Sequence, residues 1–224
     1  MDKKELNVLM IGPDIHAQGG ISAVIQKYYA GGISDMVDLK YLCTTRDTNR
    51  ITKLYCALVA YIKVLFMAPW CDIAHVHVAS RNSYKRKSII LKYLYFLKKK
   101  VIIHLHGGEF DKFFLYECND QAQRNIRDIF NKANMIIVLS LEWKEKIIGI
   151  IGTSVADRTV ILHNAVDIPA YIPKDYSLRN MIFLGRLVDG KGIKDLLSSM
   201  ATVKERFPTS QLTICGGGVI LRLT

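Results

Sequence analysis

The sequence predicts an α/β protein with one complete doubly wound domain and the opening βαβ unit of a second. Three observations carry this prediction. Short, continuous apolar runs alternate with longer stretches of helical periodicity, glycines follow several of the apolar runs, and the alternation restarts after a proline-containing stretch at 168–180. Continuous apolar strands between helices are typical of a parallel sheet that is covered on both faces.

The predicted strands of the first domain, 1–167, are short runs of mainly apolar residues. They cover 7–12, 38–44, 72–79, 100–107, 135–140 and 158–166. The predicted helices lie between them at 21–30, 54–68, 84–98, 118–133 and 141–151. Because crossover connections between parallel strands are right-handed, this order indicates a Rossmann-like domain that binds ligands beyond the carboxyl ends of its strands.

The second domain is predicted to occupy 181–224, after a linker at 168–180 that has no clear period. A strand at 180–185, an amphipathic helix at 192–208 and a strand at 210–218 make up its βαβ unit. A piece this short cannot bury a full α/β core, so we expect a truncated, partial domain.

The chain is strongly basic, with a formal net charge of +11 and a pI near 9.4. Such a charge favours an anionic partner, which includes nucleic acid, an anionic membrane surface or a phosphorylated ligand. The stretch 81–100 holds eight basic residues and no acidic one, mixed with Ile, Leu, Tyr and Phe. It is either a membrane-docking face or a partly buried helix with a charged rim. Nucleic-acid binding rests on charge alone, since no recognised motif supports it.

Cysteine usage and the N-terminus bear on localisation. The five cysteines are scattered and never form a C-x-x-C pair, which indicates reduced thiols rather than a disulfide framework or a zinc site. The N-terminus has no apolar core of the kind found in a signal peptide, and 54–70 is short for a membrane span and contains Lys63. We expect a cytoplasmic protein, with peripheral attachment to the inner face of the membrane as a further option.

Two glycine-containing loops are candidate phosphate sites. Gly19 and Gly20 stand just before a predicted helix, whose free N–H groups and dipole suit an anion. In the second loop Gly185 ends an apolar run, and Arg186 and Lys191 follow as two cations that together would grip a diphosphate. Neither loop matches G-x-G-x-x-G or a Walker motif, and the plain alternatives are a tight turn and a solvated basic turn.

Histidines recur in two H-x-H pairs. His104 and His106 alternate along a predicted strand and so point to the same side, with His106 at its carboxyl end beside a glycine pair. His106 is therefore a candidate hydrogen-bond donor or base. His75 and His77 repeat the spacing, but no Asp, Glu or Cys stands out as a third ligand, so we expect no metal. His75 and His104 are interpreted as core residues.

At these residues the chain resembles a known family. The segments "GPDIHAQGGIS", "DIAHVHVAS", "IIHLHGGEF", "ILHNAVD", "FLGRLVDGKGI" and "LTICGGG" occur in the family's order. They are similar to the retaining, nucleotide-sugar-dependent glycosyltransferases of family four, which have the GT-B fold. The resemblance covers essentially the whole chain. It implies two Rossmann-like domains facing a cleft, the first binding mostly the acceptor and the second the sugar nucleotide.

The resemblance also implies roles for single residues. It matches Gly19 and Gly20 to a loop near the donor phosphates and His106 to a histidine near the transferred sugar. It matches Arg186 and Lys191 to the pair that neutralises the departing diphosphate, a role that fits the charge developing on a leaving group. Gly185 belongs to the same loop. Further cleft candidates are His16, Asn164 and Asp167. The family needs no metal or other cofactor for this chemistry.

The expected function is therefore sugar transfer from a nucleotide-sugar to a glycan or lipid-linked acceptor, in the synthesis of a capsule or another surface polysaccharide. Two glutamates that contact the donor in the family would lie beyond Thr224, so we expect impaired activity. The alternatives are a non-catalytic remnant that binds a membrane or a partner, and a sugar-nucleotide epimerase of the same fold.

Overall fold

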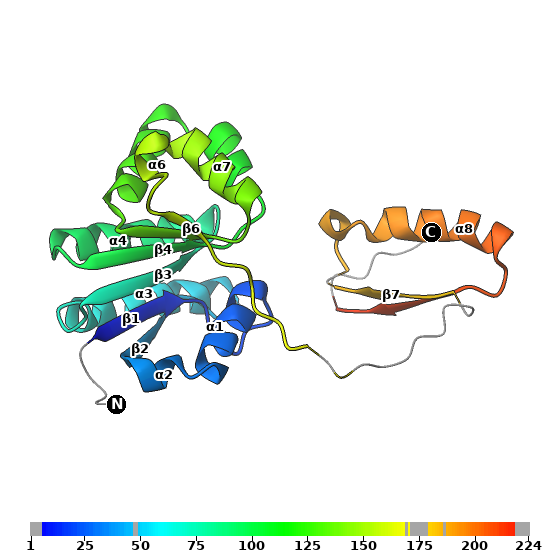
Figure 1. The fold of residues 1–224 in the computed structure, drawn as a ribbon, viewed down its shortest axis with the longest axis horizontal. Helices are drawn as coiled ribbons and strands as arrows, with labels where there is room; N and C mark the ends of the chain where they lie inside the picture. Colours follow the sequence, from blue (N-terminus) through cyan, green and yellow to red (C-terminus); the bar gives the residue numbers. More distant parts are fainter. Residues whose placement is uncertain (1–5, 47–48, 169, 171–178, 186, 218–224) are drawn as a thin grey trace. The chain divides into compact units, whose positions relative to one another are not determined.

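The computed structural model describes residues 6–46, 49–168, 170, 179–185 and 187–217, apart from the side chains of Arg50 and Asp189. The chain forms two compact units, Met1–Asp167 and Ile168–Thr224, which are described separately below (Figure 1).

The first unit is built on a six-stranded sheet in which every neighbouring pair of strands is parallel. The strand order is β2-β1-β3-β4-β5-β6. The bounds are Asn7–Gly12 for β1, Asp38–Cys43 for β2, Ile73–Val78 for β3, Lys100–Leu105 for β4, Met135–Val138 for β5 and Thr159–Ile161 for β6. Helices flank this sheet (Figure 1), so the predicted α/β, Rossmann-like architecture is confirmed.

The helices of the first unit follow the predicted order. Their bounds are Gly20–Ala30 for α1, Ile33–Met36 for α2, Arg50–Met67 for α3, Asn82–Phe96 for α4, Phe110–Lys112 for α5, Asp120–Lys132 for α6 and Leu141–Ile151 for α7. A π-helical turn, Phe113–Glu117, continues α5, and a short 3-10 turn, Thr153–Val155, follows α7. Side chains cap the starts of α3, α6 and α7 by accepting a hydrogen bond from a backbone amide in the first turn. The pairs are Asn49 with Thr52, Asn119 with Ala122, and Ser140 with Trp143.

Several boundaries differ from the prediction for local reasons. Helix α3 begins at Arg50 rather than 54, because Asn49 caps it and the apolar pattern alone does not show the polar first turn. Strand β6 ends at Ile161, whereas the apolar run continues to 166. The helical segments at 33–36 and 110–117 were missed, since each is too short to show a period.

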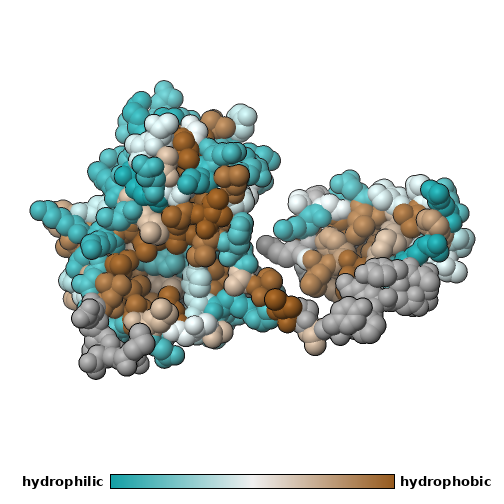
Figure 2. Space-filling view, in the orientation of Figure 1, coloured by the Kyte–Doolittle hydropathy of each residue, from teal (hydrophilic) through white to brown (hydrophobic). Residues whose placement is uncertain are grey.

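The main core lies on one face of the sheet. Leu9, Ala74 and Ile103 belong to it together with buried residues of α4, α6 and α7. The alternate residues of β3 and β4 point to the opposite face, where Tyr28 of α1 contacts the histidine rings. Figure 2 shows hydrophobic residues gathered on the side of this unit that faces the viewer, bordered by hydrophilic ones. One face of the sheet thus carries an ordinary aliphatic core and the other carries histidines.

The second unit contains two parallel strands, β7 (Asn180–Leu184) and β8 (Gln211–Cys215), joined through a 3-10 turn at Asp189–Lys191 and helix α8 (Ile193–Arg206). Ile193 and Met200 of α8 are buried, whereas Ile182 and Leu184 are 70% and 81% exposed. The loops after the two strands touch closely, since a Cβ on Gly216 would lie 1.7 Å from the Gly185 carbonyl oxygen. Only glycine fits at position 216 in this arrangement.

Candidate functional site

A pocket of about 480 Å³ lies where the loop after β1 meets the starts of α1, α3 and α4. Since all strands of the sheet are parallel, this is the edge at which such folds bind ligands. The lining residues are Pro13, Ala17, Gln18, Gly19, Gly20, Ile21, Ser22, Thr45, Arg46, Lys53, Asn82 and Arg86. We call this the cationic pocket, because three of the lining side chains that the structure describes carry a positive charge and none of these carries a negative one.

The loop that forms one wall is held in place by hydrogen bonds to its backbone. The Ser22 hydroxyl donates to the Asp14 carbonyl at 2.7 Å, and the Gln26 amide donates to the Ile15 carbonyl at 2.7 Å. The Asp14 amide donates to the Thr45 carbonyl at 2.8 Å, which joins this loop to the one after β2. The wall is therefore fixed before any ligand arrives.

Helix α1 begins in the pocket without a side-chain cap. Its N-cap residue is Gly19, which offers no acceptor, so the amides of the first turn have no intrahelical partner. A Cβ placed on Gly19 or Gly20 would meet no atom within 4 Å, and Gly19 is extended with φ −179°. The fold does not require glycine at either position, whereas close approach of a ligand to the backbone would.

The three cations come from different elements. Arg46 follows β2 and its Nε lies 3.5 Å from Asp14 Oδ2, with the side chain 63% exposed. Lys53 lies in the first turn of α3, and Arg86 lies in α4. Burial lowers the pKa of Arg86, and its Nε is buried with no hydrogen-bond partner. A guanidinium in that state gains free energy from an anion that accepts its hydrogen bond.

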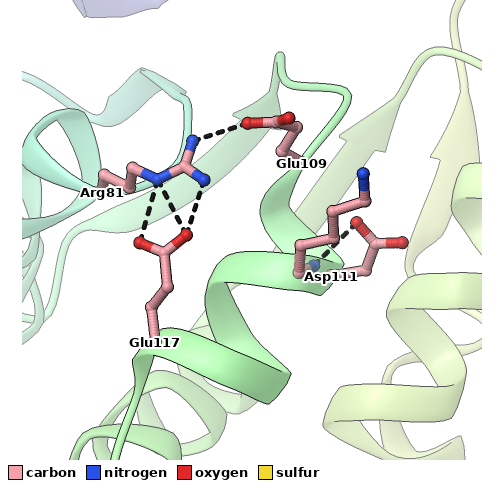
Figure 3. Close-up of polar contacts among 5 residues, drawn as sticks. Arg81, Glu109, Asp111 and Glu117 are labelled. Carbon is pink, nitrogen blue, oxygen red and sulfur yellow. Dashed lines mark hydrogen bonds and ion pairs between the residues drawn. The ribbon is translucent and has the colours of Figure 1, made fainter.

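Arg81 fixes the start of α4, a role that no local pattern in the sequence indicates. Its guanidinium pairs with Glu117 at 2.5 Å and with Glu109 at 2.6 Å (Figure 3). The backbone of Arg81 is left-handed, with φ 53° and ψ −122°, a strained conformation for a residue with a side chain. The pairing lowers the pKa of Glu109. The loop after β3 is thus tied to the segment after β4, which positions the helix that carries Arg86.

Four histidines form a buried cluster beside α1. His75 Nε2 lies 3.2 Å from His104 Nδ1, and His77 Nδ1 lies 2.8 Å from His106 Nε2. All four are at most 8% exposed. Burial lowers the pKa of His75 to about 4, of His106 to about 3 and of His104 to about 2, and it holds the pKa of His77 well below its usual value. The four rings are therefore neutral near pH 7.

This arrangement bears on the predicted catalytic residue, His106. Its backbone amide donates to the Val78 carbonyl at 2.7 Å, and its ring contacts His77 and lies within the cluster. His106 is not among the residues that line the cationic pocket. A pKa of about 3 makes it a weak base, so donation of a hydrogen bond suits it better than proton abstraction.

The remaining candidates of the first unit come from two segments, the loop after β1 and the stretch after β6. Gly19 and Gly20 line the cationic pocket, and His16 is an exposed residue of the same loop. Asp167 forms an ion pair with Lys27 of α1, and Asn164 is exposed.

In the second unit, Gly185 directly follows β7, and its amide donates to the Cys215 carbonyl at 3.0 Å. Lys191 is an exposed residue of the 3-10 turn before α8. Arg186 lies outside the described residues. The cationic clasp of Arg186 and Lys191 stays a prediction.

Comparison with known proteins gives little sequence similarity. No family model matches the chain, and no curated protein matches it. Among solved structures, the chain is similar to a 2-deoxyribosyltransferase from the psychrotolerant bacterium Bacillus psychrosaccharolyticus. The identity is 11%, the match covers 58% of this chain and 84% of the other, and the TM-score is 0.36.

These findings correct the identification as a family-four glycosyltransferase, which is wrong. No model of that family or of any other family matches the chain. Within the described residues, no helix is both long and apolar enough to cross a membrane.

Proposed function

We propose that this protein transfers a glycosyl group from a nucleotide-sugar donor, and that the cationic pocket holds phosphate groups of that donor. The observation that carries the proposal is the meeting of the uncapped start of α1 with Arg46, Lys53 and Arg86 in one pocket. Helix amides and nearby cations together are a strong anion site, because both favour negative charge at the same place.

The same groups suit the chemistry of transfer. When a sugar leaves a nucleoside diphosphate, negative charge develops on the leaving phosphate oxygen. Cations that are already oriented stabilise that charge without reorganising, which lowers the barrier to bond breaking. His106 stays a proposed hydrogen-bond donor to the sugar, and diphosphate binding by Arg186 and Lys191 stays a separate proposal for the second unit. The proposed acceptor is a glycan or a lipid-linked molecule.

The test is a transfer assay with the full chain and a panel of nucleotide sugars, following release of the nucleoside diphosphate. We expect release with at least one donor, and a loss of kcat/KM of about 10-fold or more in Arg86→Ala, the value of one charge-assisted hydrogen bond. Lys92→Ala, which removes an exposed lysine of α4 outside the pocket, is the matched control. Absence of both release and nucleoside-diphosphate binding with every base would overturn the proposal.

A second function, docking on an anionic membrane surface, is favoured by helix α3. This helix carries basic residues and no acidic one, and it packs against the basic helix α4. Its large exposed apolar side chains are Ile51, Leu54, Tyr55, Leu58, Ile62, Leu65 and Phe66, which are 48–82% exposed. A helix with an apolar stripe beside cations suits the interface of an anionic bilayer.

The sequence left 81–100 open between a membrane-docking face and a partly buried helix with a charged rim, and we now assign the apolar part of the proposed face to α3. Within 81–100, Lys87 is fully buried, while Ile89 and Phe96 are exposed. We expect the chain to bind vesicles containing phosphatidylglycerol, and Ile51→Ser with Phe66→Ser to weaken that binding. Equal binding to neutral phosphatidylcholine vesicles would contradict this function.

A further inference from the structure

The histidine cluster brings three metal-ligating groups together. His75 and His77 lie on β3 and His104 on β4, and one ring nitrogen from each lies within 4.8 Å of the others. The sequence offered no third ligand because it was sought among Asp, Glu and Cys. The structure supplies it from the other H-x-H pair, since β3 and β4 are neighbours with His77 in register with His104.

In His77 and His104, one ring nitrogen contacts a neighbouring side chain and the other has no hydrogen-bond partner. His77 Nδ1 contacts His106 Nε2 at 2.8 Å, and His104 Nδ1 contacts His75 Nε2 at 3.2 Å and the Tyr28 hydroxyl at 3.4 Å. The Nε2 atoms of His77 and His104 are both buried without a hydrogen-bond partner. Metal-ligating histidines share this pattern, in which a second group orients the ring through the nitrogen that does not bind the ion.

The two free nitrogens call for an explanation, because a buried polar atom without a partner costs free energy. Either tautomer of each ring leaves Nε2 unpaired, as a buried N–H or as a buried lone pair. His77 and His104 are 0% and 1% exposed, so bulk solvent does not reach them. An ion bound at Nε2 would satisfy both atoms at once.

We propose that His75, His77 and His104 bind a borderline transition-metal ion of the class of Zn²⁺, with His106 orienting His77. An all-imidazole ligand set suits Zn²⁺, Cu, Fe or Ni and excludes the oxygen-seeking ions Mg²⁺ and Ca²⁺. In a tetrahedral zinc site, nitrogens about 2.0–2.1 Å from the ion lie about 3.3 Å apart. One nitrogen from each of the three rings already lies within 4.8 Å of the others, so the site has to close by up to about 1.5 Å when the ion binds.

The amine of Lys87, when it is protonated, would repel a metal ion bound at the histidine cluster. Lys87 acts on His77 and His106 electrostatically, and burial lowers its own pKa to about 7. None of the four histidines lines the cationic pocket, so metal binding by His75, His77 and His104 is tested separately from phosphate binding, and only His106 belongs to both proposals.

The experiment is metal loading of the full chain. Because the ligands are at most 8% exposed, the protein is unfolded with chelator and refolded with Co²⁺, whose visible absorption reports nitrogen coordination. We expect saturation at one equivalent, displacement by Zn²⁺ but not Mg²⁺, and at least about 10-fold weaker binding in His77→Gln and His104→Gln. His163→Gln, which changes an exposed histidine outside the cluster, should bind as the wild type does.

Two further measurements decide the outcome if a ligand variant does not fold. His106→Gln keeps all three ligands and should weaken binding by about 10- to 100-fold through loss of the group that orients His77. X-ray absorption of the zinc-loaded wild type should show nitrogen ligands at about 2.0 Å. Absence of a cobalt band in the refolded wild type, oxygen ligands alone, or equal affinity in His77→Gln and His163→Gln would overturn the proposal.

Discussion

Two neighbouring regions of the first unit differ in how far their basic side chains are exposed and whether they carry a charge. In the cationic pocket, Arg46 is well exposed and carries its charge beside an uncapped helix start. In the histidine cluster next to α1, four rings are buried and neutral, and the nearby Lys87 is buried as well. The extent of burial, more than the residue type, therefore decides which basic side chains carry a charge that can bind an anionic ligand.

The largest effect on stability is expected from a substitution of the buried Lys87. Its pKa is lowered from 10.5 to about 7, so the folded chain loses stability as pH falls from 10.5 to 7. Lys87→Met removes this penalty and should raise the free energy of unfolding at pH 7 by a few kcal/mol, on the order of 3. The gain should shrink as pH rises toward 10.

Urea unfolding of Lys87→Met between pH 6 and 9 measures this gain, with Lys92→Met as the exposed control that should change stability by less than about 0.5 kcal/mol. A loss of stability in Lys87→Met at pH 7 would show that the amine's hydrogen bond to the Ser83 hydroxyl outweighs its burial.

A smaller effect is expected from the neutral histidines. The pKa of His75 is lowered from 6.5 to about 4, so its folded form binds fewer protons than the unfolded chain in that range. Stability is present above pH 6.5 and is lost as pH falls toward 4, by up to about 1.4 kcal/mol per pH unit for one histidine. His75→Gln should flatten this dependence.

The pH dependence is measured by urea unfolding from pH 7.5 to 4.5 in the presence of chelator, with His163→Gln as the control. An unchanged slope in His75→Gln would mean that His75 binds a proton in the folded state, which would contradict its burial.

The smallest effect on stability is expected at the start of α1. Gly20→Ala places a methyl group where no atom lies within 4 Å, and alanine favours the helix over glycine by up to about 1 kcal/mol. We expect unchanged or slightly raised stability together with weaker binding of inorganic pyrophosphate. Thermal unfolding and calorimetric titration of the same preparation separate the two, and unchanged binding would remove Gly20 from the pocket's ligand surface.

The sequence predicted the sheet well because most of its strands are short, mainly apolar runs, and apolar burial depends on local composition. It also found the Gly19–Gly20 loop, since glycine before a helix is a local signal. It missed Arg46 and Arg86 as pocket residues, because they follow β2 and β3 and meet only through the strand order. The charge run that contains Arg86 also contains the buried Lys87, and composition alone could not separate them.

The histidines show the same limit. Alternation along each strand placed the two members of each pair on one side, which was a local inference. That the two pairs face each other depends on the adjacency of β3 and β4, which no spacing in the sequence encodes. The role of Arg81 is likewise set by tertiary pairing with Glu109 and Glu117.

The most direct test of the account is calorimetric titration of the full chain with inorganic pyrophosphate, comparing two double variants of equal charge. Arg46→Ala with Arg86→Ala removes two cations of the cationic pocket, and Lys92→Ala with Lys98→Ala removes two exposed lysines elsewhere. If the cationic pocket is the anion site, the affinity for pyrophosphate should be at least about 100-fold lower in the first variant and near the wild-type value in the second. Equal weakening in both would mean that pyrophosphate senses only net charge, and would contradict the pocket as the anion site.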